Sequence, residues 1–317
     1  MERFPRPVRA PRPRTGRASS YVRERAAIEA SPRRRVQDAL AERGLAPRKR
    51  FGQNFLIRED LAERIVEQFR LKADDVAVEI GPGAGALTSR IAQRVRHLIA
   101  VERDAGLAEM LREDLAEVPH TELVEGDFLE FDLAAAAAAH AVPQVVVVGN
   151  IPYNVTTPIL ERVFESRASV RSAVLLVQKE YAERLSAAAG TPEYGSLTLF
   201  ARYYALLEPI MMVKASAFWP RPEVDSMLVR FLLREQPPVQ ANETLLFRII
   251  RGSFHMRRKQ LLNTLEESLG VAKDEAARLC RIAGIDPRRR GETLTLDEFA
   301  KLAREAGGLA RHGSTNL

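Results

Sequence analysis

The most specific chemistry in the sequence is offered by four consecutive residues, Asn150, Ile151, Pro152 and Tyr153. They directly follow a run of valines, so we expect them at the carboxyl end of a buried strand. The exocyclic amine of a nucleobase is a poor nucleophile, because its lone pair is delocalised into the ring. The side-chain oxygen of Asn150 and the Ile151 carbonyl, held by Pro152, would accept its two N–H groups and turn the lone pair towards an incoming methyl group. The Tyr153 ring would stack on the base, although the same residues also suit an ordinary strand-end turn.

A glycine-rich stretch predicts a nucleoside-binding loop. Gly81, Gly83 and Gly85 follow a short apolar run and precede a helical pattern, where they allow a tight turn and close approach of a ligand. Glu102 lies 21 residues beyond Gly81 and can accept hydrogen bonds from ribose hydroxyls. Asp127 ends a further strand and can hold an adenine amino group. This pattern fits NAD and S-adenosylmethionine equally well.

Strand and helix patterns alternate around these residues. The predicted strands are Val76–Ile80, His97–Glu102, Thr121–Asp127, Val145–Asn150 and the last strand, Met227–Leu233. The predicted helices between them are Asp60–Phe69, Leu87–Val95 and Gly106–Ala116. This alternation predicts an α/β fold with a mostly parallel, doubly wound sheet, in which three strand ends meet at one crevice.

A helical domain is predicted after the sheet. Residues 234–240 (REQPPVQ) contain a Pro-Pro pair that interrupts the chain. Three amphipathic stretches follow, over Thr244–Leu269, Lys273–Ile285 and Thr295–Ala306, and Thr295 is expected to cap the last helix. We therefore predict a small all-helical domain over residues 239–310.

The basic charge of the chain is concentrated at its beginning. Residues 1–50 carry 15 Arg plus Lys against 5 Asp plus Glu, a balance of +10, whereas the remainder carries −4. Such a segment either binds polyanions through phosphate contacts without base specificity or is a solvated, disordered tail. It lacks the apolar stretch of a secretory signal, and its prolines disfavour an organelle transit helix.

Composition argues against membrane, disulfide and metal-dependent classes of protein. The longest stretch without charged residues, 133–160, is broken by Pro and Asn well short of the about 20 apolar residues that a bilayer requires. Cys280 is the only cysteine, so no intramolecular disulfide can form. No metal site is expected, because the histidines show no ligand spacing; they are His97, His120, His140, His255 and His312.

Eight stretches in order give the chain a resemblance to the ribosomal RNA adenine dimethyltransferases, and among them to the small-subunit dimethyladenosine transferase family. They are RKRFGQNFL (48–56), EIGPGAGALT (79–88), VERD (101–104), EGDFL (125–129), NIPYNVTTP (150–158), VQKEYAERL (177–185), FWPRPEVDS (218–226) and FHMRRKQLLNTL (254–265). The matching region runs from about Pro47 to Ala303. The resemblance implies a Rossmann-like class I methyltransferase sheet over 46–236, a helical ribosomal RNA-binding domain over 239–310, and a basic, disordered extension over 1–45.

The resemblance also implies S-adenosyl-L-methionine as the cofactor. The residues that would bind it are Asn54, Leu56, Gly81, Gly83, Glu102, Asp127 and Asn150. Asn54 and Leu56 would close over its methionine end, while Glu102 would hold the ribose and Asp127 the adenine amine. The catalytic residues would be Asn150, Ile151, Pro152, Tyr153 and Phe218. Tyr153 and Phe218 would sandwich the target adenine.

By the same resemblance, the substrate is two adjacent adenosines in the 3′-terminal hairpin of small-subunit ribosomal RNA, each dimethylated at N6. The partner would be this RNA or the immature small subunit, bound by a cytoplasmic, monomeric protein with no membrane contact. The residues expected to contact RNA are Arg48, Lys49, Arg50, Arg257, Arg258 and Lys259, with 288–290 contributing to the same surface. Exposed arginines can equally form only a solvated face.

Three alternatives remain from the sequence. They are the large-subunit adenine methyltransferase that confers macrolide resistance, a non-enzymatic assembly or transcription factor, and a nicotinamide dehydrogenase. The NIPY segment and the glycine loop are intact, and no hydride-transfer residues are found, which favours the small-subunit methyltransferase.

Two stretches depart from the family pattern: residues 1 to about 35, and the alanine run 134–139, which we interpret as a slack connection.

Overall fold

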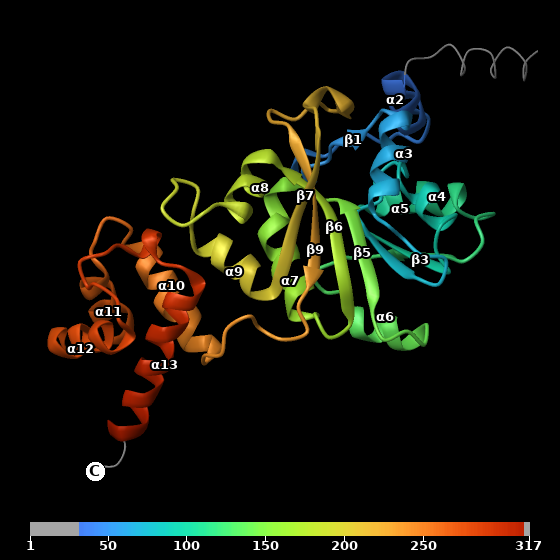
Figure 1. Cartoon of the computed structure of the whole chain (residues 1–317). Helices are drawn as coiled ribbons and strands as arrows, with labels where there is room; N and C mark the ends of the chain where they lie inside the picture. Colours follow the sequence, from blue (N-terminus) through green and yellow to red (C-terminus); the bar gives the residue numbers. More distant parts are fainter. Residues whose placement is uncertain (1–31, 314–317) are drawn as a thin grey trace, which may run out of the picture. The chain divides into compact units, whose positions relative to one another are not determined.

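The protein is described here by a computed structural model that covers residues 32–313 (Figure 1). Most of the predicted basic extension, residues 1–31, lies outside the described residues, as do residues 314–317. The chain divides between Ala46 and Pro47 into two compact units, which we consider separately. No helix within the described residues combines the length and apolar character needed to cross a bilayer.

The first unit contains helix α2 (Pro32–Glu42). Disorder was expected throughout residues 1–45, and this expectation is wrong for the helical stretch. Proline suits the first position of a helix, and the side chains of Arg34 and Asp38 pair one turn apart at 3.8 Å. Gly44, with φ +68°, follows the helix, and the Leu45 N–H donates to the carbonyl of Leu40.

The second unit is built on a seven-stranded sheet with the order β4-β3-β2-β5-β6-β9-β7. Its strands are β2 (Val76–Ile80), β3 (His97–Glu102), β4 (Thr121–Glu125), β5 (Val145–Asn150), β6 (Val170–Gln178), β7 (Ala205–Val213) and β9 (Ser226–Leu233). The first five are parallel, whereas β9 runs antiparallel to both β6 and β7. The predicted mostly parallel sheet is confirmed. A separate antiparallel pair joins β1 (Phe55–Leu56) to β8 (Phe218–Trp219).

The direction in which strands are added reverses between β2 and β5. From β2 the chain proceeds outwards through β3 to β4 and then returns to pair β5 with the other side of β2, with Ile80 opposite Gly149. Ligand sites in open α/β sheets lie at such a switch point, outside the carboxyl ends of the strands. This arrangement places the ends of β2, β3 and β5 side by side.

Helices cover both faces of the sheet. Those that accompany the strands are α3 (Glu59–Gln68), α4 (Thr88–Ala92), α5 (Ala105–Asp114), α6 (Leu133–Ala139), α7 (Thr156–Glu165), α8 (Lys179–Ser186) and α9 (Ser196–Tyr204). Apolar residues of α3 and α4 pack in one buried cluster with Ala77, Val146 and Val148. Residues of α6 and α7 pack in the other, against Val78 and Val147. Alternate strand residues therefore belong to opposite layers.

The alanine run is a helix and not the slack connection that the sequence suggested. The carboxylate of Asp132 accepts hydrogen bonds from the N–H groups of Ala134 and Ala135, which caps α6 at its start. Alanine has the highest helix propensity, and Ala136 and Ala137 are buried against the sheet. The helix ends at His140, one of the scattered histidines of the sequence.

Four helices complete the chain: α10 (Glu243–His255), α11 (Leu261–Leu269), α12 (Lys273–Ala283) and α13 (Leu296–Gly313). The predicted continuous helix over Thr244–Leu269 is instead interrupted at residues 256–260. Thr295 caps α13 as expected, since its hydroxyl accepts from the Glu298 N–H while the Glu298 carboxylate accepts from the Thr295 N–H. Short 3-10 helices are η1 (Lys49–Phe51), η2 (Tyr153–Val155), η3 (Ala215–Ala217) and η4 (Gly291–Thr293).

The close approach of β5 to β2 requires glycine at position 149. A Cβ atom built there would lie 2.7 Å from the backbone oxygen of Ile80. We predict that Gly149→Ala lowers the free energy of unfolding by about 1–3 kcal/mol, because the strands must separate to accept the methyl group. The matched control is Gly126→Ala, beside the end of β4, where an added Cβ meets nothing within 4 Å. Urea denaturation of both variants checks this, and equal stabilities would contradict it.

Candidate active site

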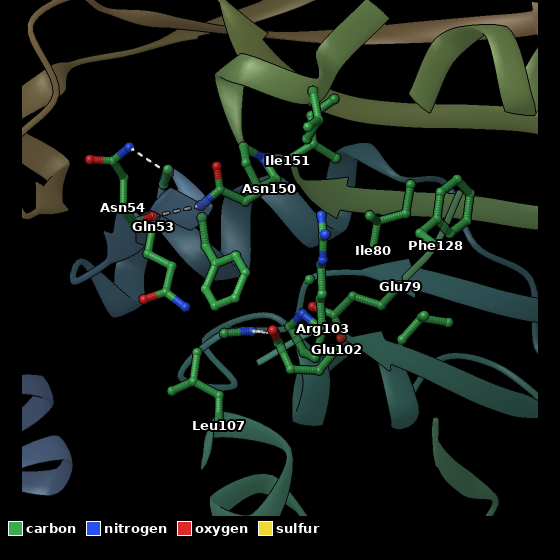
Figure 2. Close-up of a pocket in the computed structure, with 18 of the residues that line it drawn as sticks. Gln53, Asn54, Glu79, Ile80, Glu102, Arg103, Leu107, Phe128, Asn150 and Ile151 are labelled. Atoms are coloured by element: carbon green, nitrogen blue, oxygen red, sulfur yellow. Dashed lines mark hydrogen bonds between the residues drawn. The ribbon is translucent and has the colours of Figure 1, made fainter. Parts of the chain in front are cut away.

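A pocket opens at the carboxyl ends of β2, β3 and β5 (Figure 2). It encloses about 1,140 Å³ including its open mouth, which is ample for a nucleoside-sized ligand. The segment 50–56 closes one side, and the NIPY residues 150–153 line it from β5. Of the residues predicted for cofactor binding, the structure brings every one to this pocket: Asn54, Leu56, Gly81, Gly83, Glu102, Asp127 and Asn150.

The glycine loop is fixed by the carboxylate of Glu102 at the end of β3. One oxygen accepts a hydrogen bond from the Gly83 N–H at 3.0 Å, and the other accepts from the Asp104 N–H at 2.9 Å. Burial raises the pKa of Glu102, whereas these backbone donors oppose the rise. Gly81 adopts φ +60°, and an added Cβ would meet nothing within 4 Å, so the backbone is open to the pocket there.

Asp127 lies one strand further along, beyond the end of β4. One carboxylate oxygen accepts from the Leu129 N–H at 3.0 Å, and the other pairs with the Arg103 guanidinium at 3.2 Å. Each oxygen keeps a further lone pair, so Asp127 can still accept a hydrogen bond from an amino group. Arg103 also lies over the Phe51 ring, with its guanidinium carbon 5.7 Å from the ring centroid.

The segment before β1 is attached to the sheet through Asp104. This side chain is 3% exposed and caps α5 by accepting from the Gly106 N–H. Its carboxylate also accepts from the Arg48 guanidinium at 3.0 Å and from the Gln53 side-chain amide at 3.1 Å. The side-chain oxygen of Gln53 in turn accepts a hydrogen bond from the Arg48 N–H at 2.7 Å. Arg48 therefore has partners within the protein although its side chain is 44% exposed, and its role in RNA binding stays a prediction.

Asn150 is held from the same segment. Its Nδ2 donates to the backbone carbonyl of Asn54 at 3.0 Å, so its amide oxygen is the end left available to a ligand (Figure 2). Asn54 in turn donates to the carbonyl of Gly52 at 3.1 Å. Gly52 has φ +60°, and a Cβ there would lie 2.8 Å from Oδ1 of Asn154. The segment and the NIPY loop thus pack closely against each other.

The ring of Tyr153 is positioned from its hydroxyl end. Its oxygen lies 2.7 Å from the hydroxyl oxygen of Ser226, the fully buried first residue of β9. Burial raises the pKa of Tyr153, so the phenol is neutral at physiological pH. Ile151 is buried, and together with Pro152 and Tyr153 it lines the pocket, as predicted from the sequence.

Phe218 does not line the pocket. It lies in β8 opposite Leu56, is 3% exposed, and packs within the buried cluster of α3 and α4. In this structure its ring is a core side chain, so the prediction that Phe218 forms one face of an adenine site is not met by its position. The adjacent Trp219 stacks on Phe55 instead, with ring centroids 6.3 Å apart.

Glu79 is a pocket residue that sequence reasoning missed. It lies within β2, is 1% exposed, and its Oε2 is buried without a hydrogen-bond partner among the described residues. Burial raises the pKa of Glu79 to about 8; the nearby Thr88 hydroxyl opposes the rise and the Glu102 carboxylate adds to it. The available signal was an acidic residue inside an otherwise apolar strand, VAVEI, because a buried carboxyl group requires a partner.

The basic residues predicted to contact RNA differ in their availability. Arg257 is bound within the protein, donating to Glu292 and to the carbonyls of Pro192 and Tyr194. Its side chain is still 42% exposed, so its role in RNA binding stays a prediction. Lys259 lies 3.4 Å from Glu267. Three residues are exposed with no salt bridge found among the described residues: Lys49, Arg50 and Arg258.

Comparison with known sequences identifies relatives over most of the chain. The family described as Ribosomal RNA adenine dimethylase matches residues 44–306. A "Ribosomal RNA small subunit methyltransferase A" of Geobacillus thermodenitrificans is 41% identical over 275 residues, covering 85% of this chain and 94% of the relative. A protein of the same name from Bacillus mycoides is 40% identical over the same shares.

Solved structures show the same fold. A dimethyladenosine transferase from Plasmodium falciparum superposes with a TM-score of 0.66 at 22% identity, covering 80% of this chain and 97% of that one. The 23S rRNA methyltransferase ErmE gives a TM-score of 0.60 at 25% identity, covering 80% of this chain and all of the other. The sheet is that of class I methyltransferases, as the sequence predicted. With the family match and relatives at 40–41% identity, the chain belongs to the ribosomal RNA adenine dimethylase family.

Proposed function

We propose that this protein transfers methyl groups from S-adenosyl-L-methionine to N6 of two adjacent adenosines in the 3′-terminal hairpin of small-subunit ribosomal RNA. The product is N6,N6-dimethyladenosine. The observation that carries the proposal is the orientation of Asn150. Its amide nitrogen is bound to the Asn54 carbonyl, so its oxygen is left to accept a hydrogen bond from an amine in the pocket.

The pocket suits S-adenosyl-L-methionine in charge and shape. The unpartnered Oε2 of Glu79 can accept a hydrogen bond from an ammonium group, and the buried environment strengthens this pairing. Glu102 and Asp127 offer carboxylate oxygens to ribose hydroxyls and to an adenine amine. The open backbone at Gly81 leaves room for the ligand between them. When bound, the cofactor supplies an electrophilic methyl group on a sulfonium.

The residues of the NIPY loop orient the nucleophile. Asn150 Oδ1 and the Ile151 carbonyl accept the two N–H groups of the adenine amine, so that its lone pair faces the methyl group. This contribution is alignment and electrostatic stabilisation, with no general base. Tyr153 supplies a flat face for the base, fixed by its contact with Ser226. The attached ammonium proton is acidic enough to leave after transfer.

Small-subunit RNA is favoured over large-subunit RNA by the relatives. Proteins at 40–41% identity carry the small-subunit name, whereas the large-subunit enzyme ErmE is 25% identical. We further propose that the protein acts as a monomer on the immature small subunit. Arg50 and Arg258 are exposed and, within the described residues, form no salt bridge, so their guanidinium groups can contact phosphates.

Replacing Asn150 by alanine tests the proposed chemistry. We expect Asn150→Ala to reduce the rate of methyl transfer about 10²–10³-fold, because one preorganised acceptor is lost. The measurement is incorporation of labelled methyl groups into undermethylated small subunits and, in parallel, into large-subunit RNA. Asn263→Ala, in α11 of the helical domain, is the control and should keep full activity. Label in the large subunit would contradict the substrate, and no label with wild-type protein would contradict the activity.

Glu79 gives a prediction about pH. Its pKa of about 8 in the folded protein means that, between about pH 4.5 and 8, the folded chain keeps a proton that the unfolded chain releases. The contribution of Glu79 to stability therefore falls as pH rises through this window. We expect the free energy of unfolding of Glu79→Gln to depend less on pH than that of wild type. The stability of the variant relative to wild type should therefore be greater at pH 8 than at pH 5. Urea denaturation at both values measures this, with the exposed Glu109→Gln as control. Parallel pH profiles for all three proteins would contradict it.

The exposed arginines give a prediction about salt. We expect the double variant Arg50→Gln, Arg258→Gln to lower the slope of log K against log salt for RNA binding by about 1.4–1.8, since each phosphate contact releases a counterion. Arg112→Gln is the control, because this residue lies outside those predicted to contact RNA and its guanidinium pairs with Glu125 at 3.7 Å. Filter binding to small-subunit RNA over a salt series measures the slopes. An unchanged slope in the double variant would remove both residues from the RNA surface.

A further inference from the structure

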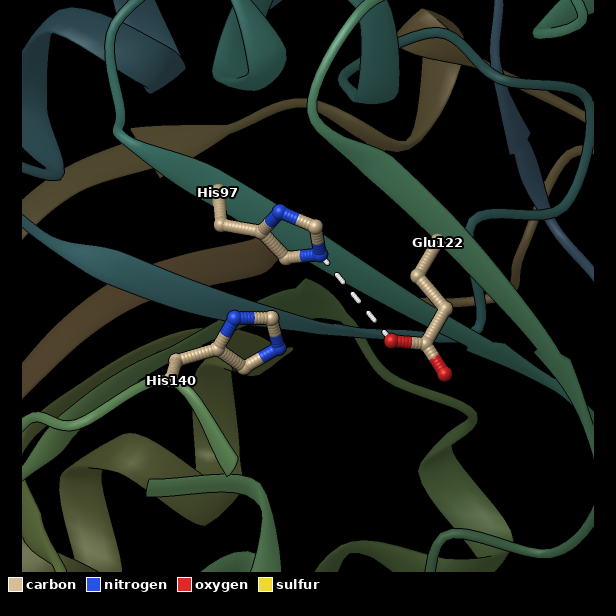
Figure 3. Close-up of side chains that lie close together, drawn as sticks. All are labelled: His97, Glu122 and His140. Carbon is tan, nitrogen blue, oxygen red and sulfur yellow. Dashed lines mark ion pairs between the residues drawn. The ribbon is translucent and has the colours of Figure 1, made fainter. Parts of the chain in front are cut away.

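Three side chains converge at the edge of the sheet opposite the pocket: His97, Glu122 and His140 (Figure 3). His97 is the first residue of β3. Glu122, in β4, lies opposite Ile99, so His97 and Glu122 are diagonal neighbours on one face of the sheet. His140 is the residue at which α6 ends. The guanidinium of Arg96 donates to the backbone carbonyl of His140 and ties the end of this helix to β3.

The side chains are close enough to share one ligand. The Nε2 atom of His97 lies 3.9 Å from a carboxylate oxygen of Glu122, and the two imidazole rings have centroids 4.1 Å apart. One ligand atom from each residue lies within 4.8 Å of the other two. The four-coordinate geometry of zinc, with bonds of about 2.0–2.1 Å, requires separations of about 3.3 Å. Closing this difference requires small rotations of the three side chains, and Glu122, whose side chain is 54% exposed, has room to move.

One ring nitrogen of His97 has no hydrogen-bond partner within the described residues. This atom, Nε2, is buried. A buried polar atom left unpaired costs free energy, and an ion is one of the groups that can satisfy it. An imidazole nitrogen without another partner is available to bind a metal ion.

Besides His140, the titratable or charged groups near His97 are Glu122, His120 and Arg96. The carboxylate of Glu122 supplies the negative charge that a cation needs. The donors are two nitrogens and one carboxylate, without a thiolate, a set that suits zinc and its neighbours in the transition series.

We propose that His97, Glu122 and His140 bind one divalent transition-metal ion of the zinc type, with water completing its coordination. The site lies at the amino end of β3, five residues and about 16 Å along the strand from Glu102 in the pocket. It is therefore a structural tie that joins β3, β4 and the end of α6, and it takes no part in methyl transfer.

Titration of the untagged, full-length protein with zinc chloride tests the proposal. After removal of metal by a chelator and dialysis, calorimetry should show one zinc ion per chain. The melting temperature should rise by about 5 °C at a zinc concentration about 100 times the Kd. Cobalt(II) should give the visible absorption of a four-coordinate nitrogen and oxygen site. An absence of saturable binding would overturn the proposal.

Variants locate the site. His97→Gln, Glu122→Gln and His140→Gln should each raise the Kd for zinc at least about tenfold, whereas His120→Gln, at an exposed turn nearby, should leave it unchanged. Glu122 is the most exposed ligand, so its variant decides the question even if a histidine variant fails to fold. Wild-type affinity in Glu122→Gln and in the folded histidine variants would overturn the proposal. A loss confined to His120→Gln would overturn it equally.

Discussion

The buried carboxylate of Asp104 is the interaction on which the rest of the candidate site depends. It caps α5, and it also receives the side chains of Arg48 and Gln53. These bonds hold the segment before β1 against the end of β3. The same segment presents the Asn54 carbonyl to the amide of Asn150. The Asp104 carboxylate therefore determines, through the segment that contains Gln53 and Asn54, which end of the Asn150 amide faces the pocket.

Other polar side chains of the site are likewise held by contacts within the protein. Asn150 and Tyr153 each use one polar end for a contact within the protein, which leaves the amide oxygen and the aromatic ring for ligands. Preorganisation of this kind matters because alignment, and not proton transfer, is the main requirement of methyl transfer to an amine. Glu79 is the exception, since its buried oxygen has no partner among the described residues. An unsatisfied buried carboxyl group is costly to fold around, and a cationic ligand in the pocket would supply the missing partner.

The basic residues that cluster in the sequence are not equally available at the protein surface. Arg48 and Arg257 belong to basic stretches that suggested RNA contacts, yet both bind groups within the protein. Arg257 joins the end of α10 to the loop before α9, and Gly190 of that loop donates to the carbonyl of Glu292. Arg257 therefore contributes to the joint between the loop before α9 and the terminal helices, whereas Arg48 holds the segment before β1 to the start of α5. Arg258, the next residue, is exposed.

The sequence by itself determined most strands and helices around the site and most of the pocket, because period-2 and period-3.6 patterns and the glycine loop are local signals. The family was indicated by the resemblance of eight motifs in order. It could not place Phe218, whose burial follows from the pairing of β8 with β1, far apart in the chain. The alanine run was misjudged because its helix depends on a cap and on packing against the sheet. His97 and His140 looked scattered in the sequence because their proximity also depends on tertiary structure. Only the parallel sheet, by bringing the beginnings of β3 and β4 to one edge beside the end of α6, placed them next to Glu122.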